Sequence, residues 1–341
     1  MNIENNDLKL SILDFVHIYG NSNASESLKN VIEMAQLAEE LGYTRYWFTE
    51  HHNTKTSIST SPEMLTMHAA AHTKRIRVGS GGVMLPNHSA LKVMENFTLL
   101  EGLHPGRIDL GIGRASGTDG QTMLALLRSR ELMWANDFPN QLEDLLSFFK
   151  RDFKKDHPFS QITPPGDKSM IPDVYMLGSS EGGLQFALDK GLGFVFAAQL
   201  APQLAIPILR AYKNEFKSSS YLSEPKSIIA LMVIVAETEE EAEFIAGPAE
   251  LMWAQISTGT IDLSFSTPLE AKNHIYTLAE ESARERNKSR FVIGSVENVA
   301  ETLHRLAKDS LVDEIIIVDF YPDQESRKKG HKLLAKELGL C

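Results

Sequence analysis

Cysteine is almost absent from this chain of 341 residues, the only one being Cys341. A single thiol cannot form an intramolecular disulfide, so nothing indicates an oxidising compartment. Residues 1–7 are polar and acidic, without the basic and apolar segments of a secretory signal. No apolar run approaches the roughly 20 residues that a membrane-spanning helix needs. These absences predict a cytoplasmic protein with no membrane partner.

Basic residues are also fewer than acidic ones. The chain has 34 Lys and Arg against 45 Asp and Glu, a formal net charge of −11. A duplex nucleic acid partner normally demands a basic face, and none is visible, so no nucleic acid partner is expected. We attribute the acidic excess to solubility. With 43% hydrophobic residues the chain can bury a large core, and we expect one domain over residues 1–341.

Short apolar runs alternate with amphipathic stretches along the chain. The runs that predict strands are residues 9–16, 45–50, 77–85, 107–111, 174–177, 193–197, 227–235 and 314–319. The stretches that predict helices are residues 28–41, 62–72, 90–103, 183–190, 202–216, 239–255 and 296–309. Eight strands, each followed by a helix, favour a parallel α/β fold.

Two parallel layouts compete, an open doubly wound sheet and a closed barrel. The Gly-rich fingerprint that opens a helix after the first strand of a dinucleotide-binding sheet is missing from residues 16–22. The sequence therefore predicts a TIM (β/α)8 barrel. Two stretches exceed the repeat: residues 115–174 after strand four, helical around 121–149, and residues 257–290 after strand seven, helical over 268–286. Long insertions on a barrel commonly form active-site walls and lids.

Strand two ends in four polar residues: Glu50, His51, His52 and Asn53. Barrel enzymes carry their chemistry where strands end, and an imidazole there can donate a hydrogen bond or exchange a proton near neutral pH. The alternative is that one histidine caps the strand and the other is merely exposed.

Metal and serine-nucleophile chemistry lack their sequence signatures. The chain has no His-Glu-x-x-His motif and no Gly-x-Ser-x-Gly elbow. His68 and His72 are spaced as metal ligands on a helix could be, but ordinary helical histidines are the better interpretation. We expect no metal site.

Strand three carries Gly79, Gly81 and Gly82 close together. Glycine weakens a strand and often marks the close approach of a ligand or of another backbone. A bulge or a cis bond could be accommodated there at least cost. Close packing inside the barrel is the alternative explanation.

The ends of strands four and five offer groups that bind anions. Arg114 is flanked by glycines, and Gly178-Ser179-Ser180 leads into a helix whose first N–H groups are free. Because strands four and five are neighbours in a barrel, these residues could hold one phosphate between them.

Four runs of the sequence, in this order and spacing, resemble luciferase-like flavin-dependent monooxygenases of the bacterial luciferase superfamily. They are residues 46–52, 79–88, 105–114 and 177–180. Residues 114–128 are similar to a non-luminous subgroup. Ser179 stands where luciferases carry Glu, and Gly113 where some carry a reactive cysteine, so luminescence is not expected.

The resemblance implies a TIM barrel that binds FMN at the carboxyl ends of its strands, usually in a homodimer. It assigns His51 and Glu50 to the catalytic site and Gly81-Gly82, often joined by a cis peptide, to the place where the flavin ring rests. The residues it implies as phosphate contacts are Arg114, Gly178, Ser179 and Ser180.

The implied reaction uses reduced FMN and O2 to oxygenate an unidentified small organic substrate. No second dinucleotide fingerprint is present, so a separate NAD(P)H:flavin reductase is the expected partner. Two alternatives remain: a deazaflavin-dependent hydride-transfer enzyme, and a flavin-binding protein without turnover, which the Glu50-His51-His52 site disfavours. Residues 257–290 are expected to form a mobile gate over the flavin, with a fixed packing or dimer-contact element as the alternative.

Overall fold

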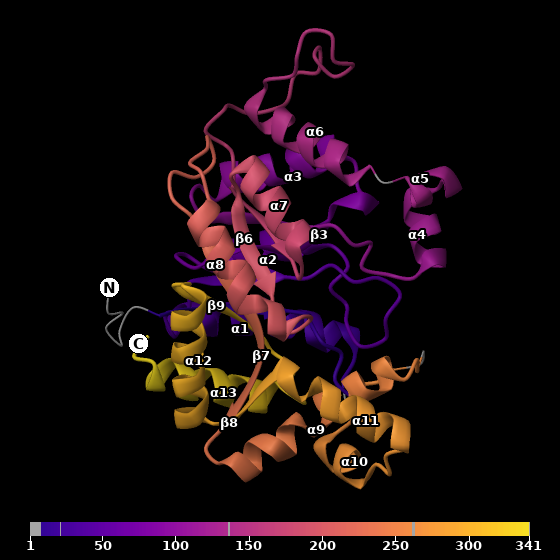
Figure 1. Cartoon of the computed structure of the whole chain (residues 1–341), viewed down its shortest axis with the longest axis vertical. Helices are drawn as coiled ribbons and strands as arrows, with labels where there is room; N and C mark the ends of the chain where they lie inside the picture. The colour runs from indigo at the N-terminus through magenta and orange to yellow at the C-terminus, as the bar shows by residue number, and fades with distance from the viewer. Residues whose placement is uncertain (1–7, 21, 136, 261–262, 341) are drawn as a thin grey trace.

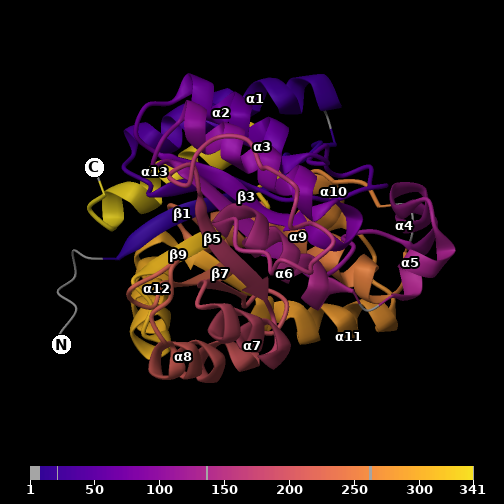
Figure 2. The ribbon, with the colours of Figure 1, turned by 90° about the horizontal axis from the view of Figure 1, so that it is seen from above.

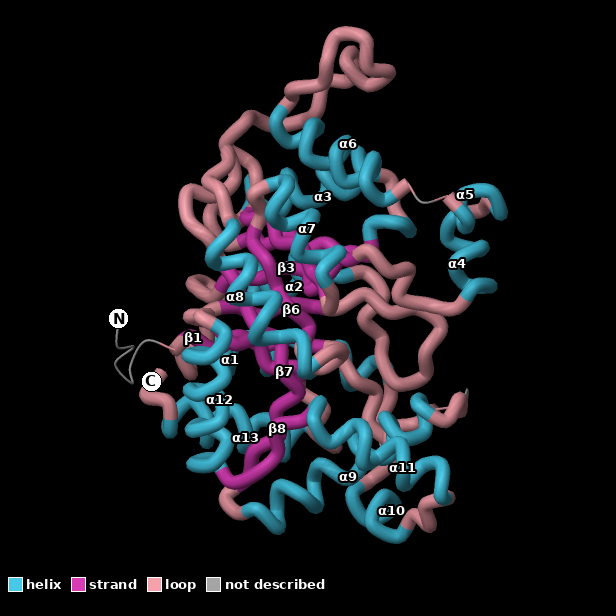
Figure 3. The backbone as a smooth tube through the Cα atoms, viewed as in Figure 1, coloured by secondary structure: helices cyan, strands magenta, loops and turns pink. Residues whose placement is uncertain are grey.

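Eight parallel strands close into a barrel at the centre of the structure (Figure 1, Figure 3). The structure is a computed structural model and describes residues 8–20, 22–135, 137–260 and 263–340. The barrel strands are β1 (Lys9–Asp14), β2 (Arg45–Phe48), β3 (Arg77–Met84), β4 (Ile108–Gly113), β5 (Asp173–Gly178), β6 (Gly193–Ala197), β7 (Ser227–Ala236) and β9 (Glu314–Val318). Pairing of Phe194 with Ser227 closes the ring between β6 and β7, and β9 lies between β7 and β1. The predicted TIM barrel is confirmed.

Helices surround the barrel and follow its strands. They are α1 (Ala24–Glu40), α2 (Pro62–His72), α3 (Ala90–Leu103), α4 (Gly120–Leu127), α5 (Arg130–Trp134), α6 (Phe138–Lys150), α7 (Glu181–Lys190), α8 (Ala205–Glu215), α9 (Glu239–Ser257), α10 (Pro268–Asn273), α11 (Leu278–Asn287), α12 (Val296–Ser310) and α13 (Gln324–Glu337). No helix within the described ranges is long and apolar enough to cross a membrane.

Burial on both faces explains why the strands read as continuous apolar runs. All five residues of β9 are buried, because one face points into the barrel and the other is covered by helices. The helices bury one stripe each: in α12, Val296, Val299, Ala300 and Leu303 repeat at helical spacing. A large apolar cluster therefore fills the space between strands and helices, and a smaller one fills the barrel interior.

The structure corrects several predicted boundaries. Strand β2 ends at Phe48, two residues before the predicted end, so Glu50 and His51 lie in the loop that follows. A ninth strand, β8 (Phe291–Ser295), was not predicted; β7 is ten residues long and pairs β8 with its second half, outside the barrel. Helix α13 was also not among the predicted ranges.

Both predicted insertions are present. The helical stretch expected around residues 121–149 is three helices, α4, α5 and α6, after β4. The helix expected over residues 268–286 is two, α10 and α11, after β7. Figures 1 and 2 show α4 and α5 of the first excursion and α10 and α11 of the second on one side of the barrel, and the ends of the chain on the opposite side. The excursions thus flank the carboxyl ends of the strands.

Candidate active site

Glu50 is the fully buried hub of the loop that follows β2. Its carboxylate accepts hydrogen bonds from His88 Nε2 at 2.8 Å, His52 Nε2 at 2.9 Å, the Met84 N–H at 2.9 Å and Asn87 Nδ2 at 3.2 Å. Burial opposes ionisation, but the bonds from His88, His52 and Met84 outweigh it and lower the pKa of Glu50. Glu50 therefore joins the loops after β2 and β3 as a carboxylate.

His51 differs from its neighbours because no side chain in the described part of the protein forms a hydrogen bond with it. Its backbone N–H donates to the Ser59 carbonyl at 2.8 Å, and its ring stacks on Phe15 with centroids 4.9 Å apart. The buried Nδ1 atom has no hydrogen-bond partner among the described residues. Burial, together with the nearby His17, lowers the pKa of His51 to about 4 although Glu50 acts in the opposite direction. His51 is thus a neutral imidazole at neutral pH, and its Nδ1 has no hydrogen-bond partner among the described residues.

The residues that follow β1 complete the surroundings of His51, and they were not among the predicted site residues. Phe15 and His17 stack with ring centroids 5.4 Å apart. Between them Val16 has a φ of 48°, which is costly for a β-branched residue. Phe320, which follows β9, packs on both rings. The rule that barrel chemistry lies at strand ends could have found His17, which comes three residues after the end of β1.

The Gly81–Gly82 peptide of β3 is cis, and the register with β4 shifts between Gly81 and Val83. Both the cis bond and the bulge considered from the sequence are therefore present. A Cβ atom on Gly81 would lie 2.5 Å from Leu13 Cδ1, and one on Gly82 would lie 2.7 Å from the Gly111 carbonyl oxygen. Backbone packing within the barrel thus already requires glycine at position 82, whether or not a ligand rests there, whereas at position 81 the end of the Leu13 side chain would have to shift.

Arg114 and Ser180 meet between the ends of β4 and β5. Arg114 is exposed, its Nη2 lies 3.4 Å from Ser180 Oγ, and no acidic side chain pairs with it in the described residues. Ser180 is the N-cap of α7, yet its hydroxyl does not cap the helix. A Cβ on Gly182 would lie 2.7 Å from Arg114 Nη1, so glycine lets the guanidinium lie over the start of the helix. Gly178 is the last residue of β5, and Ser179 follows it directly before this position.

A hollow of about 260 Å³ adjoins Arg114. Its apolar wall comes from helices α4, α5 and α6, through Met123, Leu127, Leu132 and Phe138. No residue of α4 or α5 is buried, although both helices are rich in apolar side chains, and Trp134 is 86% exposed. The excursion after β4 therefore forms an apolar wall beside Arg114.

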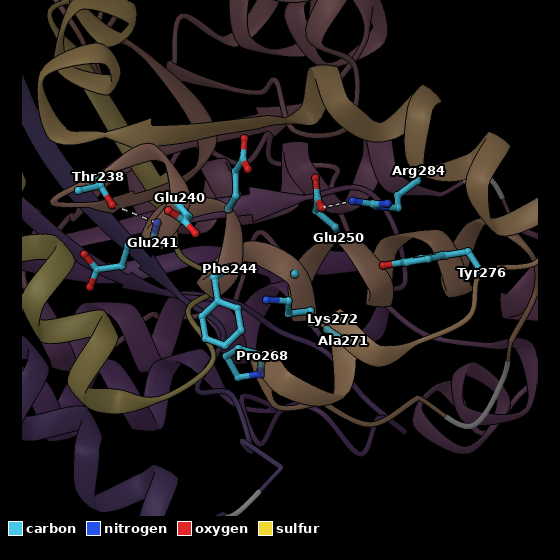
Figure 4. A pocket seen from close by; sticks show the side chains of 12 residues that line it. Thr238, Glu240, Glu241, Phe244, Glu250, Pro268, Ala271, Lys272, Tyr276 and Arg284 are labelled. Carbon is cyan, nitrogen blue, oxygen red and sulfur yellow. Dashed lines mark hydrogen bonds and ion pairs between the residues drawn. The ribbon is translucent and has the colours of Figure 1, made fainter.

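A second hollow, of about 650 Å³, lies between α9, α10 and α11 and is lined by none of the predicted site residues (Figure 4). Glu250 and Arg284, labelled in Figure 4, form an ion pair of 3.0 Å, and Arg284 lies over the Tyr276 ring. Although it is larger, this hollow has its principal basic group already paired, so we place the candidate active site at Arg114 and His51.

The excursion after β7 is attached to the barrel at several points. Phe265 is 2% exposed and packs against His17 and Tyr19. Arg290 donates to the carbonyl of Gln199, which follows β6, at 2.6 Å. Within the excursion itself, Asn287 at the end of α11 donates to Ser257 Oγ at the end of α9 at 3.0 Å. Residues 261–262 of the predicted gate lie outside the described residues.

A family model described as luciferase-like monooxygenase matches residues 8–314. The chain belongs to the luciferase-like monooxygenase family. It is 38% identical to YwcH of Bacillus subtilis, over 96% of this chain and 98% of that protein. It is 31% identical to the N-acetyl-S-alkylcysteine monooxygenase of the same organism, over 96% and 97% of the two chains. The solved structure of apo-MsnO8 is 30% identical, covers 99% of each chain and superposes with a TM-score of 0.87.

More distant members of this fold differ in cofactor. The oxygenating component of 3,6-diketocamphane monooxygenase from Pseudomonas putida, solved with FMN, has a TM-score of 0.71 at 16% identity. An F420-dependent secondary alcohol dehydrogenase, solved with an F420-acetone adduct, has a TM-score of 0.65 at 13% identity. These likenesses show the shared barrel alone, so the choice between cofactors depends on the residues of the site.

Proposed function

We propose that this protein is an FMN-dependent monooxygenase that uses reduced flavin and O2 to oxygenate a small organic compound. The observation that carries the proposal is the arrangement of Arg114 at the uncapped start of α7, together with a half-buried His51 whose Nδ1 has no hydrogen-bond partner among the described residues. A phosphate would find a fixed cation and unpaired helix N–H groups at the first position. The reacting group of a substrate would find an uncharged imidazole at the second.

The residues present fit FMN. Arg114, Ser179, Ser180 and Gly178 would hold its phosphate, and the flavin ring would rest at Gly81-Gly82. When bound, the reduced flavin would supply the electrons and the site of O2 activation. The phosphate contacts explain why Arg114 lacks a carboxylate partner within the described ranges and why the Ser180 hydroxyl is left unused by its own helix.

The protein's own groups bind, orient and exclude water. Glu50 holds the loops after β2 and β3 together through its four donors and thereby sets the position of the adjacent His51. His51 donates or accepts a hydrogen bond at Nδ1 without carrying a charge, because its pKa of about 4 keeps it neutral. Phe15 and Phe320 shield this position from water.

Titration of FMN into the Arg114→Ala variant tests the proposal. Loss of a charge-assisted contact worth about 1.5–3 kcal/mol should weaken FMN binding about 10- to 150-fold. Arg128→Ala removes an exposed arginine from the end of α4 and serves as the matched control. Unchanged FMN affinity in Arg114→Ala, or binding of a deazaflavin such as F420 in preference to FMN, would contradict it. A protein that binds reduced FMN but consumes no O2 with any organic substrate would instead be a flavin-binding protein without turnover.

The proposed function includes two protein partners. A separate NAD(P)H:flavin reductase would supply reduced FMN. A second copy of the chain would cover an exposed apolar surface on the neighbouring helices α2 and α3, where Met64 is 70%, Leu99 56% and Leu103 61% exposed. Sedimentation equilibrium of the wild type and of Leu103→Glu tests the pairing, which a monomeric wild type would refute.

A further inference from the structure

His17 is a buried titratable residue that the proposed function leaves without a role. It follows β1 at the carboxyl end of the barrel and is 5% exposed. Its Nδ1 lies 3.4 Å from the Thr56 carbonyl oxygen, and its buried Nε2 has no hydrogen-bond partner among the described residues. Buried polar groups normally find partners, so one that does not calls for an explanation.

The ring of Phe15 links His17 to His51. Phe15 is nearly parallel to the His17 imidazole, at 4°, and is tilted by 22° from the His51 imidazole. Phe320 packs on Phe15 at 5.1 Å and on His17 at 4.6 Å, and Phe265 packs on His17 at 5.1 Å. His17 and Phe320 thus support Phe15, and Phe15 in turn supports the ring of His51.

The two imidazoles lie in different electrostatic surroundings. The charged groups that act on His17 are the buried Asp319 and Asp14, which favour its protonation, and Arg327, which opposes it. Arg327 is shared, at 2.7 Å from Asp319 and 3.2 Å from Asp14. Burial has the largest effect and lowers the pKa of His17.

Fewer groups near His51 than near His17 favour the protonated imidazole. The groups that act on it are His17 and His52, which oppose protonation, and Glu50, which favours it. Glu50 already accepts hydrogen bonds from four donors. A proton that enters this part of the site is therefore held better on His17, next to two carboxylates, than on His51.

We propose that His17 is a positioning residue for His51: it holds the Phe15 ring against the His51 imidazole and takes the proton that would otherwise charge His51. This inference rests on the proposed function for its consequence in turnover. The coupling between the two imidazoles is a property of the protein without cofactor.

Histidine-labelled NMR tests the coupling in the FMN-free protein. His17→Phe keeps an aromatic ring in the stack and removes the titrating group; His51→Gln assigns the His51 signals. We expect His17 to protonate before His51 in the wild type, and His51 to titrate at higher pH in His17→Phe. His304→Gln, which removes an imidazole from α12 outside the barrel, should leave the His51 titration unchanged. An identical His51 titration curve in His17→Phe and wild type would overturn the inference.

Measurements of turnover separate the two parts of the role proposed for His17, the support of Phe15 and the binding of the proton. In His17→Phe the maximal rate of oxygenation should stay within about 2-fold, while the acid limb of the pH–rate profile moves to higher pH because His51 becomes charged more readily. In His17→Ala the rate should fall about 10-fold at every pH with unchanged FMN affinity, since the support of Phe15 is lost. An unmoved acid limb in His17→Phe would contradict the inference. If NMR shows the coupling but no variant, nor the wild type, oxygenates anything, the proposed function fails and the coupling stands.

Discussion

The two ends of the barrel differ in the buried polar groups that they hold. At the amino ends of the strands Arg45 donates from Nε to Glu314 at 2.6 Å and from Nη1 to Asp109 at 2.9 Å. Asp109 also accepts from Trp47 Nε1 at 2.9 Å and from Arg77 Nε at 3.0 Å. Each charge in this group has an opposite charge in direct contact. Burial opposes the charge of Arg45, yet its carboxylate neighbours raise its pKa further above the ordinary range.

The carboxyl ends contain buried polar atoms left without partners. In the described residues these atoms are His17 Nε2, Thr49 Oγ1, His51 Nδ1, Asn87 Oδ1, Gln199 Oε1 and, on α9, Trp253 Nε1. A folded protein leaves few such groups unsatisfied, because each costs about 1–3 kcal/mol. Unpartnered buried atoms also lie near the amino ends, on Glu101, His104 and Ser310, and the carboxyl ends hold paired carboxylates at Glu50 and Asp319. What distinguishes the carboxyl ends is two imidazoles, His17 and His51, that each have a nitrogen unpartnered within the described ranges, where barrel enzymes bind their ligands. We therefore call the amino ends, with their closed ion network, the paired end, and the carboxyl ends, with these two imidazoles, the unpaired end.

Breaking the paired end should have the largest effect on stability. Asp109→Ala leaves Arg45, Arg77 and the Trp47 N–H short of an acceptor, and removing one partner of a buried ion pair costs about 3–5 kcal/mol. The melting temperature, measured by calorimetry, should fall by roughly 5–10 °C. Asp313→Ala, an exposed carboxylate directly before β9, is the matched control and should change the free energy of unfolding by less than about 0.5 kcal/mol. A melting temperature of Asp109→Ala equal to that of the control would show that the network is not what stabilises this end.

Changing the unpaired end should affect turnover instead. His51→Ala removes the imidazole with the free nitrogen and should lower the rate of oxygenation about 10²-fold or more. Its melting temperature should stay within a few degrees of wild type at pH 8, because no side-chain hydrogen bond to the ring is lost within the described residues. His304→Ala on α12 is the control for both measurements. Unfolding of His51→Ala, or normal turnover, would make the residue structural or incidental.

The sequence predicted the barrel because its signals are local and periodic. Burial on both faces makes the residues of β9 consecutively apolar, and burial on one face gives α12 its apolar stripe. Both patterns can be recognised within a short stretch of sequence. The proximity of Arg114 and Ser180 was also predictable, since both follow strands that any parallel barrel with this strand order places side by side. β8 escaped because its register depends on β7 extending beyond the barrel, which no local pattern shows.

The contacts within the site were less predictable. Glu50 stood out as a polar residue at a strand end, but its bonding partners His88 and Asn87 lie 38 and 37 residues further along the chain, in another loop. The role inferred for His17 depends on Phe15, on Phe320 and on an ion pair between the end of β1 and α13. Such a group can be recognised only when strands distant in sequence are already in place.

Acid should weaken the unpaired end through His51. In the unfolded chain the pKa of a histidine is near 6.5, whereas burial lowers that of folded His51 to about 4. The unfolded state therefore binds more protons between these values, and His51 makes the fold lose stability as the pH falls from about 6.5 to 4. Between pH 8 and pH 5 this loss amounts to about 2 kcal/mol. Urea unfolding at the two pH values should therefore show that His51→Ala loses about 2 kcal/mol less of its free energy of unfolding than the wild type. Equal losses in variant and wild type would refute the burial of a neutral ring.

The smallest effect, a change in hydrogen exchange, is expected where the excursion after β7 meets the unpaired end. We predict that residues 257–268 open and close over the flavin, since substrate must enter a site that excludes water. Phe265 is the contact that such an opening must break, because it is buried against His17 and Tyr19. Hydrogen exchange of this segment should be fast in the free protein, slower with FMN bound, and faster still in Phe265→Ala. Ile275→Ala, in the same excursion but 91% exposed, should leave exchange unchanged. Slow exchange in the free protein that FMN does not alter would make the segment a fixed wall of the site, held at Phe265 as firmly as the ion network holds the opposite end.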